Sequence, residues 1–317
     1  MEATEDPVDL IGRTPLLKLN GLFPGSPADI YAKLEFQNLM SVKDRPVLSM
    51  IRAGIEEGSI RSETEVVEAS SGNTAIAIAL LGAVMGFRVR IFMSELASVE
   101  RRQIITAYGA KVVITPGSEH TKGARQRAIR YCEENPDTTY FLNQHSNPNN
   151  GLAHYRTTGP EIWEQTNGKI DIMIIGLGTS GTFDGLSTYF KEKDPSIRII
   201  CFEPESSPVY SGGEQGKHKL IGIGPGFQTE NFLRSRKNMD ELILVPDDEA
   251  YEMTRRIARK EGLLVGVTSG AAAWVAEKVA GRSENRGKTI CCLFYDTGER
   301  YLTTPDLFPT DNVEYMD

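Results

Sequence analysis

Short apolar segments of strand length alternate with longer segments of helical periodicity along most of the chain. The run Asp171-Ile172-Met173-Ile174-Ile175 is almost wholly apolar, as expected of a strand that a parallel sheet buries on both faces. Repeated strand–helix alternation is typical of α/β proteins, because each helix returns the chain across the sheet. The sequence therefore predicts an α/β fold with largely parallel sheets. The main expected strands are residues 30–35, 64–69, 88–93, 111–115, 138–142, 171–175, 198–202, 242–245 and 289–294, and the main expected helices are residues 46–57, 75–86, 98–108, 120–134, 152–164, 247–261 and 269–280.

Two stretches interrupt this alternation. Residues 1–29 and 203–240 contain repeated Gly and Pro and are expected to be mainly irregular. A third stretch, residues 145–151 (His-Ser-Asn-Pro-Asn-Asn-Gly), is the best candidate for a domain boundary, and 317 residues suffice for two domains with sizeable cores. We therefore expect an N-terminal segment (1–40) that packs on the larger domain, a smaller domain (41–150) and a larger domain (151–317).

The overall charge and composition exclude several classes of protein. The formal net charge of −8 argues against nucleic acid or an anionic membrane as the main partner. The acidic N-terminus is no signal peptide, and no apolar run is long enough to span a bilayer. The 4 cysteines lack metal-ligand spacing and the 4 histidines are scattered, so we expect no metal site and a reducing, cytoplasmic location.

Lys43 lies between the expected strand 30–35 and the expected helix 46–57. Asp44 and Pro46 are typical helix-start residues, so Lys43 falls just before the first turn. The positive end of the helix dipole disfavours an ammonium there and favours the free amine. A desolvated lysine of this kind has the chemistry to form a Schiff base, although the pattern alone also fits a solvated lysine at a helix start.

Two loops, each between a predicted strand and a predicted helix, combine glycine with hydroxyl residues. In residues 176–182 (Gly-Leu-Gly-Thr-Ser-Gly-Thr) glycine lets backbone N–H groups approach an anion, and the hydroxyls add donors. No Gly-Lys-Ser/Thr follows, so this is not a Walker loop. Residues 70–74 (Ser-Ser-Gly-Asn-Thr) have the same context and suit a carboxylate. Residues 176–182 also fit a purely structural turn, and residues 70–74 also fit a simple helix N-cap.

Two further stretches carry weaker signals. Residues 265–273 are small residues that lead into a helix, where close helix packing explains them equally well. Residues 295–302 (Tyr-Asp-Thr-Gly-Glu-Arg-Tyr-Leu) follow an expected buried strand, and polar residues at such strand ends tend to line ligand crevices.

These motifs, in this order, resemble the β-family (fold type II) of pyridoxal-phosphate enzymes, and within it the cysteine synthases (O-acetylserine sulfhydrylases) and the catalytic core of cystathionine β-synthase. The resemblance runs from residue 11 to residue 302. It implies two three-layer α/β/α domains with pyridoxal 5′-phosphate in the cleft between them.

The resemblance also implies roles for individual residues. Lys43 matches the lysine that forms the Schiff base and moves the Cα proton, Asn73 the asparagine that contacts the 3′-hydroxyl of the cofactor, and Thr297 the hydroxyl that faces the pyridine nitrogen. The phosphate loop comprises Gly178, Thr179, Ser180, Gly181 and Thr182. The substrate-binding residues are Ser70, Ser71, Gly72, Thr74, Gln144 and Gly222, the last in a loop over the active site.

Two departures from the family pattern bear on the substrate. The segment Asn38-Leu39-Met40-Ser41 is one residue shorter and more apolar than the usual Asn-Pro-x-x-Ser, and Ala75 stands where glycine is common. We expect Leu39 and Met40 to add apolar bulk near Lys43 and so to favour a small nucleophile. An O-phosphoserine donor would need a cation beside the site, for which only Arg234 and Arg236 are candidates.

The expected reaction is therefore β-replacement on an activated serine by sulfide or a small thiol, through an aminoacrylate, with O-acetylserine as the default donor and L-cysteine as the product. A cystathionine-type condensation, a diaminopropionate-type synthase, O-phosphoserine as donor, a serine/threonine dehydratase and a non-catalytic homologue remain alternatives. The resemblance further implies a homodimer and a serine acetyltransferase as a candidate partner.

Overall fold

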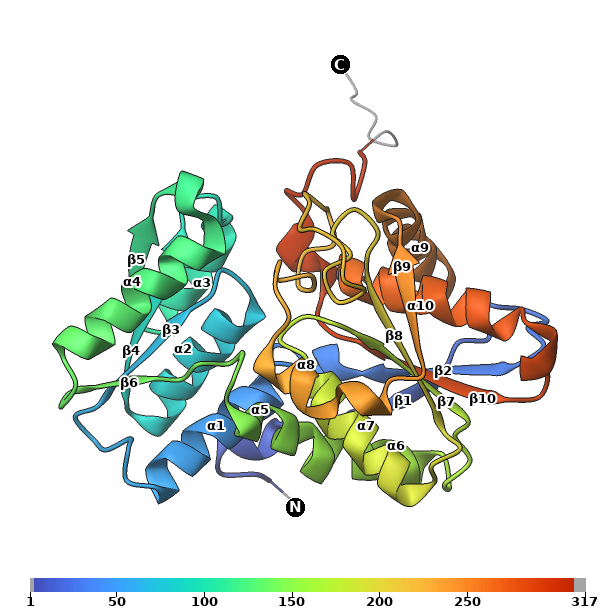
Figure 1. Ribbon diagram of the computed structural model, residues 1–317, viewed down its shortest axis with the longest axis horizontal. Coiled ribbons are helices and arrows are strands. Elements are labelled where there is room, and N and C mark those ends of the chain that lie inside the picture. Colours follow the sequence, from blue (N-terminus) through green and yellow to red (C-terminus); the bar gives the residue numbers. More distant parts are fainter. Residues whose placement is uncertain (1–2, 311–317) are drawn as a thin grey trace.

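The computed structural model describes residues 3–310, apart from the side chain of His120, and has two lobes (Figure 1). The larger lobe is built on a six-stranded sheet in the order β1-β2-β10-β7-β8-β9, and the smaller on a four-stranded sheet in the order β5-β4-β3-β6. Among the strands of residues 3–310, only β1 runs antiparallel to its neighbour. The α/β class with largely parallel sheets is confirmed.

The larger sheet draws on both ends of the chain. Its strands are β1 (Leu16–Lys18), β2 (Asp29–Leu34), β7 (Ile172–Gly176), β8 (Arg198–Pro204), β9 (Glu241–Val245) and β10 (Thr289–Phe294). Strand β2 pairs in parallel with β10 over its whole length, so part of the N-terminal segment lies within this sheet rather than only on its surface. The cysteines at 201, 291 and 292 lie in β8 and β10 and are fully buried.

Helices cover both faces of the larger sheet (Figure 1). One face carries α9 (Asp247–Glu261) and α10 (Val267–Ala280), and the other carries α6 (Gly159–Gln165) and α7 (Gly181–Lys193). The strand β7 is buried along its whole length, as its continuous apolar sequence predicts for a central strand. This lobe therefore has three layers.

The smaller lobe has the same layered plan. Its strands are β3 (Glu65–Ala69), β4 (Arg88–Ser94), β5 (Lys111–Thr115) and β6 (Thr139–Phe141). The helices α1 (Asp44–Glu56), α2 (Asn73–Met85) and α3 (Val99–Ala107) share one apolar core with the sheet, and α4 (His120–Glu134) covers the opposite face. No helix among residues 3–310 combines the length and the apolar character needed to cross a bilayer.

The structure differs from the sequence-based expectation around residue 150. The expected helix 152–164 begins earlier, as α5 (Pro148–Ala153), and continues through a π-helical turn (His154–Thr158) into α6. The Asn147 side chain caps α5 and Pro148 occupies its first turn, so residues that suggested a loop are helix-start signals instead. The π turn precedes Pro160, which has no N–H to donate, and the Gly159 N–H donates to the His154 carbonyl.

A second difference lies in the stretch 203–240. It contains the helix α8 (Glu230–Ser235) and a short 3-10 helix, Arg236–Asn238, within the expected irregular region. The Thr229 side chain caps α8 by accepting a hydrogen bond from the Phe232 N–H. A helix this short offers too few periods of apolar residues to be recognised by periodicity.

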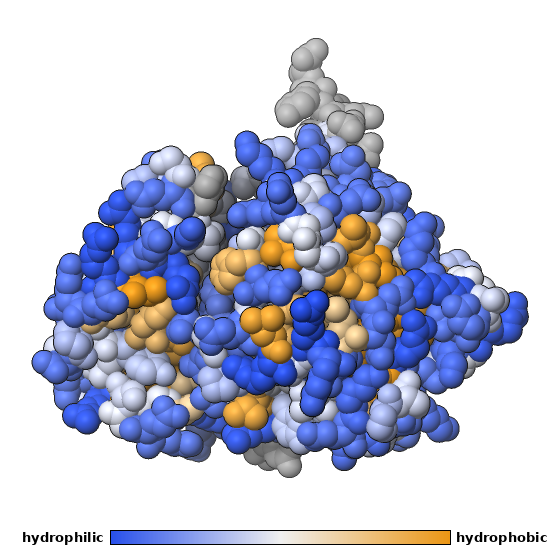
Figure 2. All heavy atoms as spheres, in the orientation of Figure 1, coloured by the Kyte–Doolittle hydropathy of each residue, from blue (hydrophilic) through white to orange (hydrophobic). Residues whose placement is uncertain are grey.

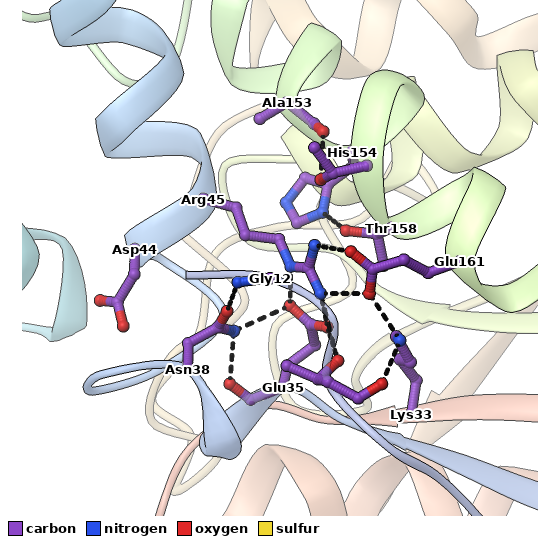
Figure 3. Close-up of polar contacts among 12 residues, drawn as sticks. Gly12, Lys33, Glu35, Asn38, Asp44, Arg45, Ala153, His154, Thr158 and Glu161 are labelled. Carbon is purple, nitrogen blue, oxygen red and sulfur yellow. Dashed lines mark hydrogen bonds and ion pairs between the residues drawn. The ribbon is translucent and has the colours of Figure 1, made fainter. Parts of the chain in front are cut away.

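A buried cluster of charged residues joins the two lobes (Figure 3). Arg45 of α1 binds Glu35, which follows β2, at 2.8 Å and Glu161 of α6 at 2.6 Å. Lys33 of β2 binds the same Glu161 at 2.7 Å, and its side chain is fully buried. Although burial alone would raise it, hydrogen bonds and charges from Arg45 and Lys33 lower the pKa of Glu161 to about 2.

We predict that Glu161→Gln destabilises the protein by about 3 kcal/mol at pH 7, because it leaves two buried cations without their shared anion. The pKa of Glu161 is depressed in the folded state, so this contribution is present above its ordinary pKa of 4.5 and is lost as the pH falls toward about 2. Urea unfolding at pH 7 and pH 3 should show the difference between variant and wild type shrinking in acid.

Asp248→Asn is the matched control. It makes the same chemical change in an exposed ion pair, where Asp248 is 92% exposed and 3.5 Å from Lys219. Its effect should stay within about 0.5 kcal/mol. A Glu161→Gln variant as stable as this control would mean that the cluster does not join the lobes energetically.

Candidate active site

The carboxyl ends of β3 and β6 in one lobe face those of β7 and β10 in the other, and side chains bridge the two sets of loops. Asn73, which begins α2, donates from Nδ2 to Asp296 Oδ2 at 2.7 Å across the lobes. Asn150 Nδ2 lies 3.2 Å from Thr179 Oγ1. A cavity of about 370 Å³ opens beside these contacts and is lined from both lobes by residues that include Ser71 and Ile221. Ligands of parallel α/β sheets bind at such strand ends.

Lys43 directly precedes α1, where the sequence predicts it. The turn before it is fixed by Asp44, whose carboxylate accepts hydrogen bonds from the N–H groups of Met40 and Ser41. Burial lowers the pKa of Lys43 to about 8, against the opposing charge of Asp296. Among residues 3–310, Nζ of Lys43 has no hydrogen-bond partner, whereas Nζ of Lys33 has three. Lys43, which is partly exposed, is therefore the lysine whose amine is available for chemistry.

The loop 70–74 connects β3 to α2 and meets the loop that follows β6. Thr74 Oγ1 donates to Gln144 Oε1 at 2.6 Å, so the structure brings together the two segments that were predicted to bind a carboxylate. The Gln144 N–H donates to Glu68 Oε2, a buried carboxylate at the end of β3. Gly72 has open space where a side chain would stand, and Ser70, Ser71 and Gly72 are partly exposed toward this region.

The loop 177–182 leads from β7 into α7, as the sequence predicts. Ser180 adopts a left-handed conformation with φ of 61°, which turns the chain into the helix. A Cβ on Gly178 would lie 2.8 Å from the Gly222 carbonyl, so only glycine allows this approach of the loop over the site. The loop thus combines hydroxyl side chains, backbone N–H groups and the α7 N-terminus, and residues 176–182 include no lysine or arginine.

Asp296 and Thr297 follow β10 but differ in their surroundings. Asp296 is 2% exposed, accepts hydrogen bonds from Asn73 and from the Tyr301 hydroxyl, and has a buried Oδ1 without a partner among residues 3–310. Thr297 is partly exposed, and its backbone pairs with Val265. Asp296, which the sequence argument set aside, is thus the one of the two that contacts the predicted cofactor-binding Asn73.

Sequence reasoning missed three further residues. Thr268 starts α10 and donates to the Ile221 carbonyl beside Gly222, although its stretch read equally well as helix packing. Arg101 of α3 is 7% exposed, donates to the Ser71 carbonyl and has an Nε without a partner among residues 3–310. Arg300 donates to Asn73 Oδ1 and to the Met40 carbonyl. Arg101 and Arg300 both line the cavity between the lobes.

One sequence-based expectation needs correction. Arg234 is bound to Asp184 at 2.7 Å on the outer side of α7, and Arg236 is exposed, so the cations beside the substrate loop are Arg101 and Arg300 instead. Leu39 and Met40 pack against the apolar core of the smaller lobe. Both side chains are partly exposed, so their effect on the room for a nucleophile stays a prediction.

Comparison with known proteins decides the family. Residues 8–296 match the family described as "Pyridoxal-phosphate dependent enzyme". The chain belongs to this family. Pyridoxal phosphate is therefore its cofactor, and the resemblance inferred from the motifs is confirmed.

The chain is also similar to individual proteins, in both sequence and structure. The chain is 44% identical over 308 residues to a cysteine synthase of Staphylococcus aureus (strain Mu50 / ATCC 700699), covering 95% of this chain and 97% of the relative. It superposes on the cysteine synthase of Entamoeba histolytica with a TM-score of 0.93 at 37% identity, over 100% of this chain and 93% of the other. An O-acetylserine dependent cystathionine beta-synthase from Helicobacter pylori gives a TM-score of 0.89 at 38% identity, covering 95% and 98%.

The residues present fit the cofactor of the family. The loop 177–182 supplies neutral donors and a helix N-terminus for a phosphate dianion, and Lys43 offers an amine with a lowered pKa for the aldehyde. Asp296 Oδ1, which is buried and has no partner within residues 3–310, and the side chain of Asn73 provide further polar groups.

We predict that Lys43 in the cofactor-free protein titrates with a midpoint near pH 8, because burial disfavours the ammonium form. The free amine should therefore accumulate as the pH rises through 8, well below the ordinary lysine value of 10.5. Competitive acetylation from pH 6 to pH 11 with peptide mass mapping measures this, with the exposed Lys217 as reference.

Asp296→Asn tests the opposing charge. Asp296 raises the pKa of Lys43, so its neutralisation should lower the midpoint further. A midpoint close to 10.5 in the wild type would instead mean that the Lys43 amine is solvated.

Proposed function

We propose that this protein catalyses β-replacement on an activated serine, with O-acetylserine as donor and sulfide as nucleophile, to give L-cysteine. The observation that carries the proposal is Lys43, whose amine has a lowered pKa, no hydrogen-bond partner among the described residues, and charge interactions with Asp296 and with His145, the neighbour of Gln144. The S. aureus and E. histolytica relatives are both cysteine synthases.

In this proposal, residues from both lobes bind the cofactor. Its phosphate is bound by the loop 178–182 and the N-terminus of α7. Its aldehyde carbon is bound by Lys43, its 3′-hydroxyl by Asn73, and its pyridine nitrogen faces Thr297. Thr268, buried beside Gly222, is a second hydroxyl that could serve the pyridine nitrogen, and Thr268→Val against Thr297→Val would separate the two.

The substrate is bound through its α-carboxylate. Ser70, Ser71, Gly72, Thr74 and Gln144 supply neutral donors there, and the N-terminus of α2 adds a favourable field. Pyridoxal phosphate, when bound, supplies an electron sink for the carbon to which the amino group is attached. Lys43, whose pKa of about 8 lies near neutrality, accepts the Cα proton and later returns it.

O-Phosphoserine is a second candidate donor. Arg101 and Arg300 line the cavity that also borders Ser71, and Arg101 is buried with an unpaired Nε. Guanidinium groups bind phosphate bidentately and would favour a phosphorylated leaving group over an acetyl group. O-Acetylserine remains the first choice because both arginines already donate to backbone or side-chain oxygens.

We also propose a cellular location, an oligomeric state and a partner. We infer a cytoplasmic enzyme that acts as a homodimer on small molecules, with a serine acetyltransferase as candidate partner. Three of the four cysteines are buried and all four are free thiols, which supports a reducing compartment.

We predict that Lys43→Ala abolishes β-replacement turnover, because no other described lysine offers an amine at the site. Borohydride reduction of the wild-type holoenzyme should attach the cofactor to the tryptic peptide that contains Lys43. Lys33→Met is a control, since its amine serves the ion cluster. Attachment to Lys33 would refute the assignment.

We further predict that O-acetylserine with sulfide gives the fastest product formation among three reactions, the others being O-phosphoserine with sulfide and serine with homocysteine. Arg101→Met should lower kcat/KM for O-phosphoserine at least tenfold more than for O-acetylserine if Arg101 contacts the phosphate. Equal losses for both donors would assign Arg101 to support of the Ser71 loop alone. Faster turnover with homocysteine would replace the sulfide proposal with a cystathionine-forming one.

A further inference from the structure

A buried histidine lies directly behind the anion-binding loop and is not used in the proposed reaction. His154 is 0% exposed and begins the π-helical turn between α5 and α6 (Figure 3). Its Nδ1 lies 2.9 Å from Thr158 Oγ1. Its Nε2 lies 3.2 Å from Thr182 Oγ1, in the first turn of α7. Both ring nitrogens thus have a hydroxyl partner, and one partner belongs to the loop that is proposed to bind the phosphate.

The imidazole is neutral in these surroundings. Burial lowers the pKa of His154 well below its ordinary value, and the cations Arg45 and Lys43 lower it further, against an opposing effect of Glu161. A neutral imidazole carries a single N–H, so one nitrogen donates and the other accepts.

The hydroxyl of Thr158 decides which nitrogen donates. Thr158 is 0% exposed, and among residues 3–310 the only partner of its Oγ1 is Nδ1 of His154. Among the same residues Thr182 Oγ1 also contacts only the His154 ring, but Thr182 is 6% exposed and lies in the loop proposed to bind the phosphate, so its hydroxyl proton has an acceptor outside the protein. A buried hydroxyl proton needs an acceptor, and Nδ1 provides one only if it carries no proton itself. The proton of the ring then lies on Nε2 and points at Thr182 Oγ1.

We propose that His154 is a positioning residue for the cofactor phosphate: its Nε2–H donates to Thr182 Oγ1, which directs the Thr182 hydroxyl proton to the phosphate. The inference rests on the proposed phosphate site at residues 178–182. In the opposite tautomer Nε2 would accept the Thr182 proton, and that hydroxyl could offer the dianion only lone pairs. The series Thr158, His154, Thr182 therefore sets one of the phosphate donors in advance.

The backbone supports this arrangement. The π-helical turn begins at His154 and places His154 and Thr158 at positions whose side chains meet. A Cβ on Gly185 of α7 would lie 2.8 Å from the His154 Cβ, so glycine there lets α7 approach the turn closely enough for the Thr182 contact. Single π-helical turns are frequent at functional sites.

The tautomer is tested directly on the cofactor-free wild-type protein. Long-range ¹H–¹⁵N correlation spectra with histidine labelling should show His154 neutral with its proton on Nε2 at pH 7. Thr158→Val removes the hydroxyl that donates to Nδ1 and should weaken this preference. A proton on Nδ1 in the wild type would overturn the proposal without any reference to activity.

The effect on binding is tested with a pair of ligands that differ only in the phosphate. Thr182→Val and His154→Phe should each weaken the binding of pyridoxal phosphate about tenfold, the value of one oriented hydrogen bond to a charged group. Binding of pyridoxal, which lacks the phosphate, should change less than twofold. Thr182→Ser should restore wild-type affinity, and the double variant should bind no more weakly than Thr182→Val alone.

The possible failures are distinguishable. Equal losses for both ligands, or additive losses in the double variant, would reduce His154 to a packing role and overturn the inference. If His154→Phe does not fold, the Thr182→Val and Thr182→Ser pair and the tautomer measurement still decide it. If the cofactor attaches at Lys43 but the variants lose no more affinity for pyridoxal phosphate than for pyridoxal, the positioning role of His154 is refuted. The proposed function is then left intact.

Discussion

The interaction of Arg45 with Glu35 and Glu161 is the contact on which the two-lobe arrangement depends. Arg45 lies on α1, whose apolar face packs in the smaller lobe, while its two carboxylate partners lie directly after β2 and on α6 of the larger lobe. A guanidinium has enough donors to bind both carboxylates at once, and burial makes any rearrangement costly. Because Lys43 is only two residues before Arg45, the same contact fixes the reactive amine relative to both lobes.

The ion cluster and the anion-binding loop are parts of one continuous polar structure. His154 lies beside Arg45 (Figure 3), and its ring also contacts Thr182. The two ends of the proposed cofactor site, the amine and the phosphate loop, are therefore positioned by a common set of buried groups. Such polar sets restrict the conformations available to the residues that they connect. The face of the molecule drawn in Figure 2 is largely hydrophilic, with apolar residues in patches on both lobes.

Local sequence signals were sufficient for the fold and for the loops of the site. The apolar run of β7, the glycine and hydroxyl residues after it, and the helix-start residues after Lys43 are each encoded within about ten residues. The contacts of Asp296, Arg101 and Arg300 could not be foreseen in this way. Asn73 and Asp296 are 223 residues apart in sequence, and Arg300 and Met40 are 260 apart. These contacts form only when the folded chain brings the two lobes together. They bury charged side chains such as Asp296 and Arg101, which by residue type are usually exposed.

The burial of the cysteines has a chemical consequence. Burial raises the pKa of Cys291 to about 12 and that of Cys201 and Cys292 well above the ordinary thiol value. Thiol–disulfide exchange and oxidation both proceed through the thiolate, which these residues do not form near neutral pH. The proposed reaction releases a thiol, and any disulfide formed when that product is oxidised would otherwise exchange with reactive thiols of the protein. By placing these thiols in the central strands of the larger sheet, the fold makes them inert toward the sulfur compounds that the active site handles.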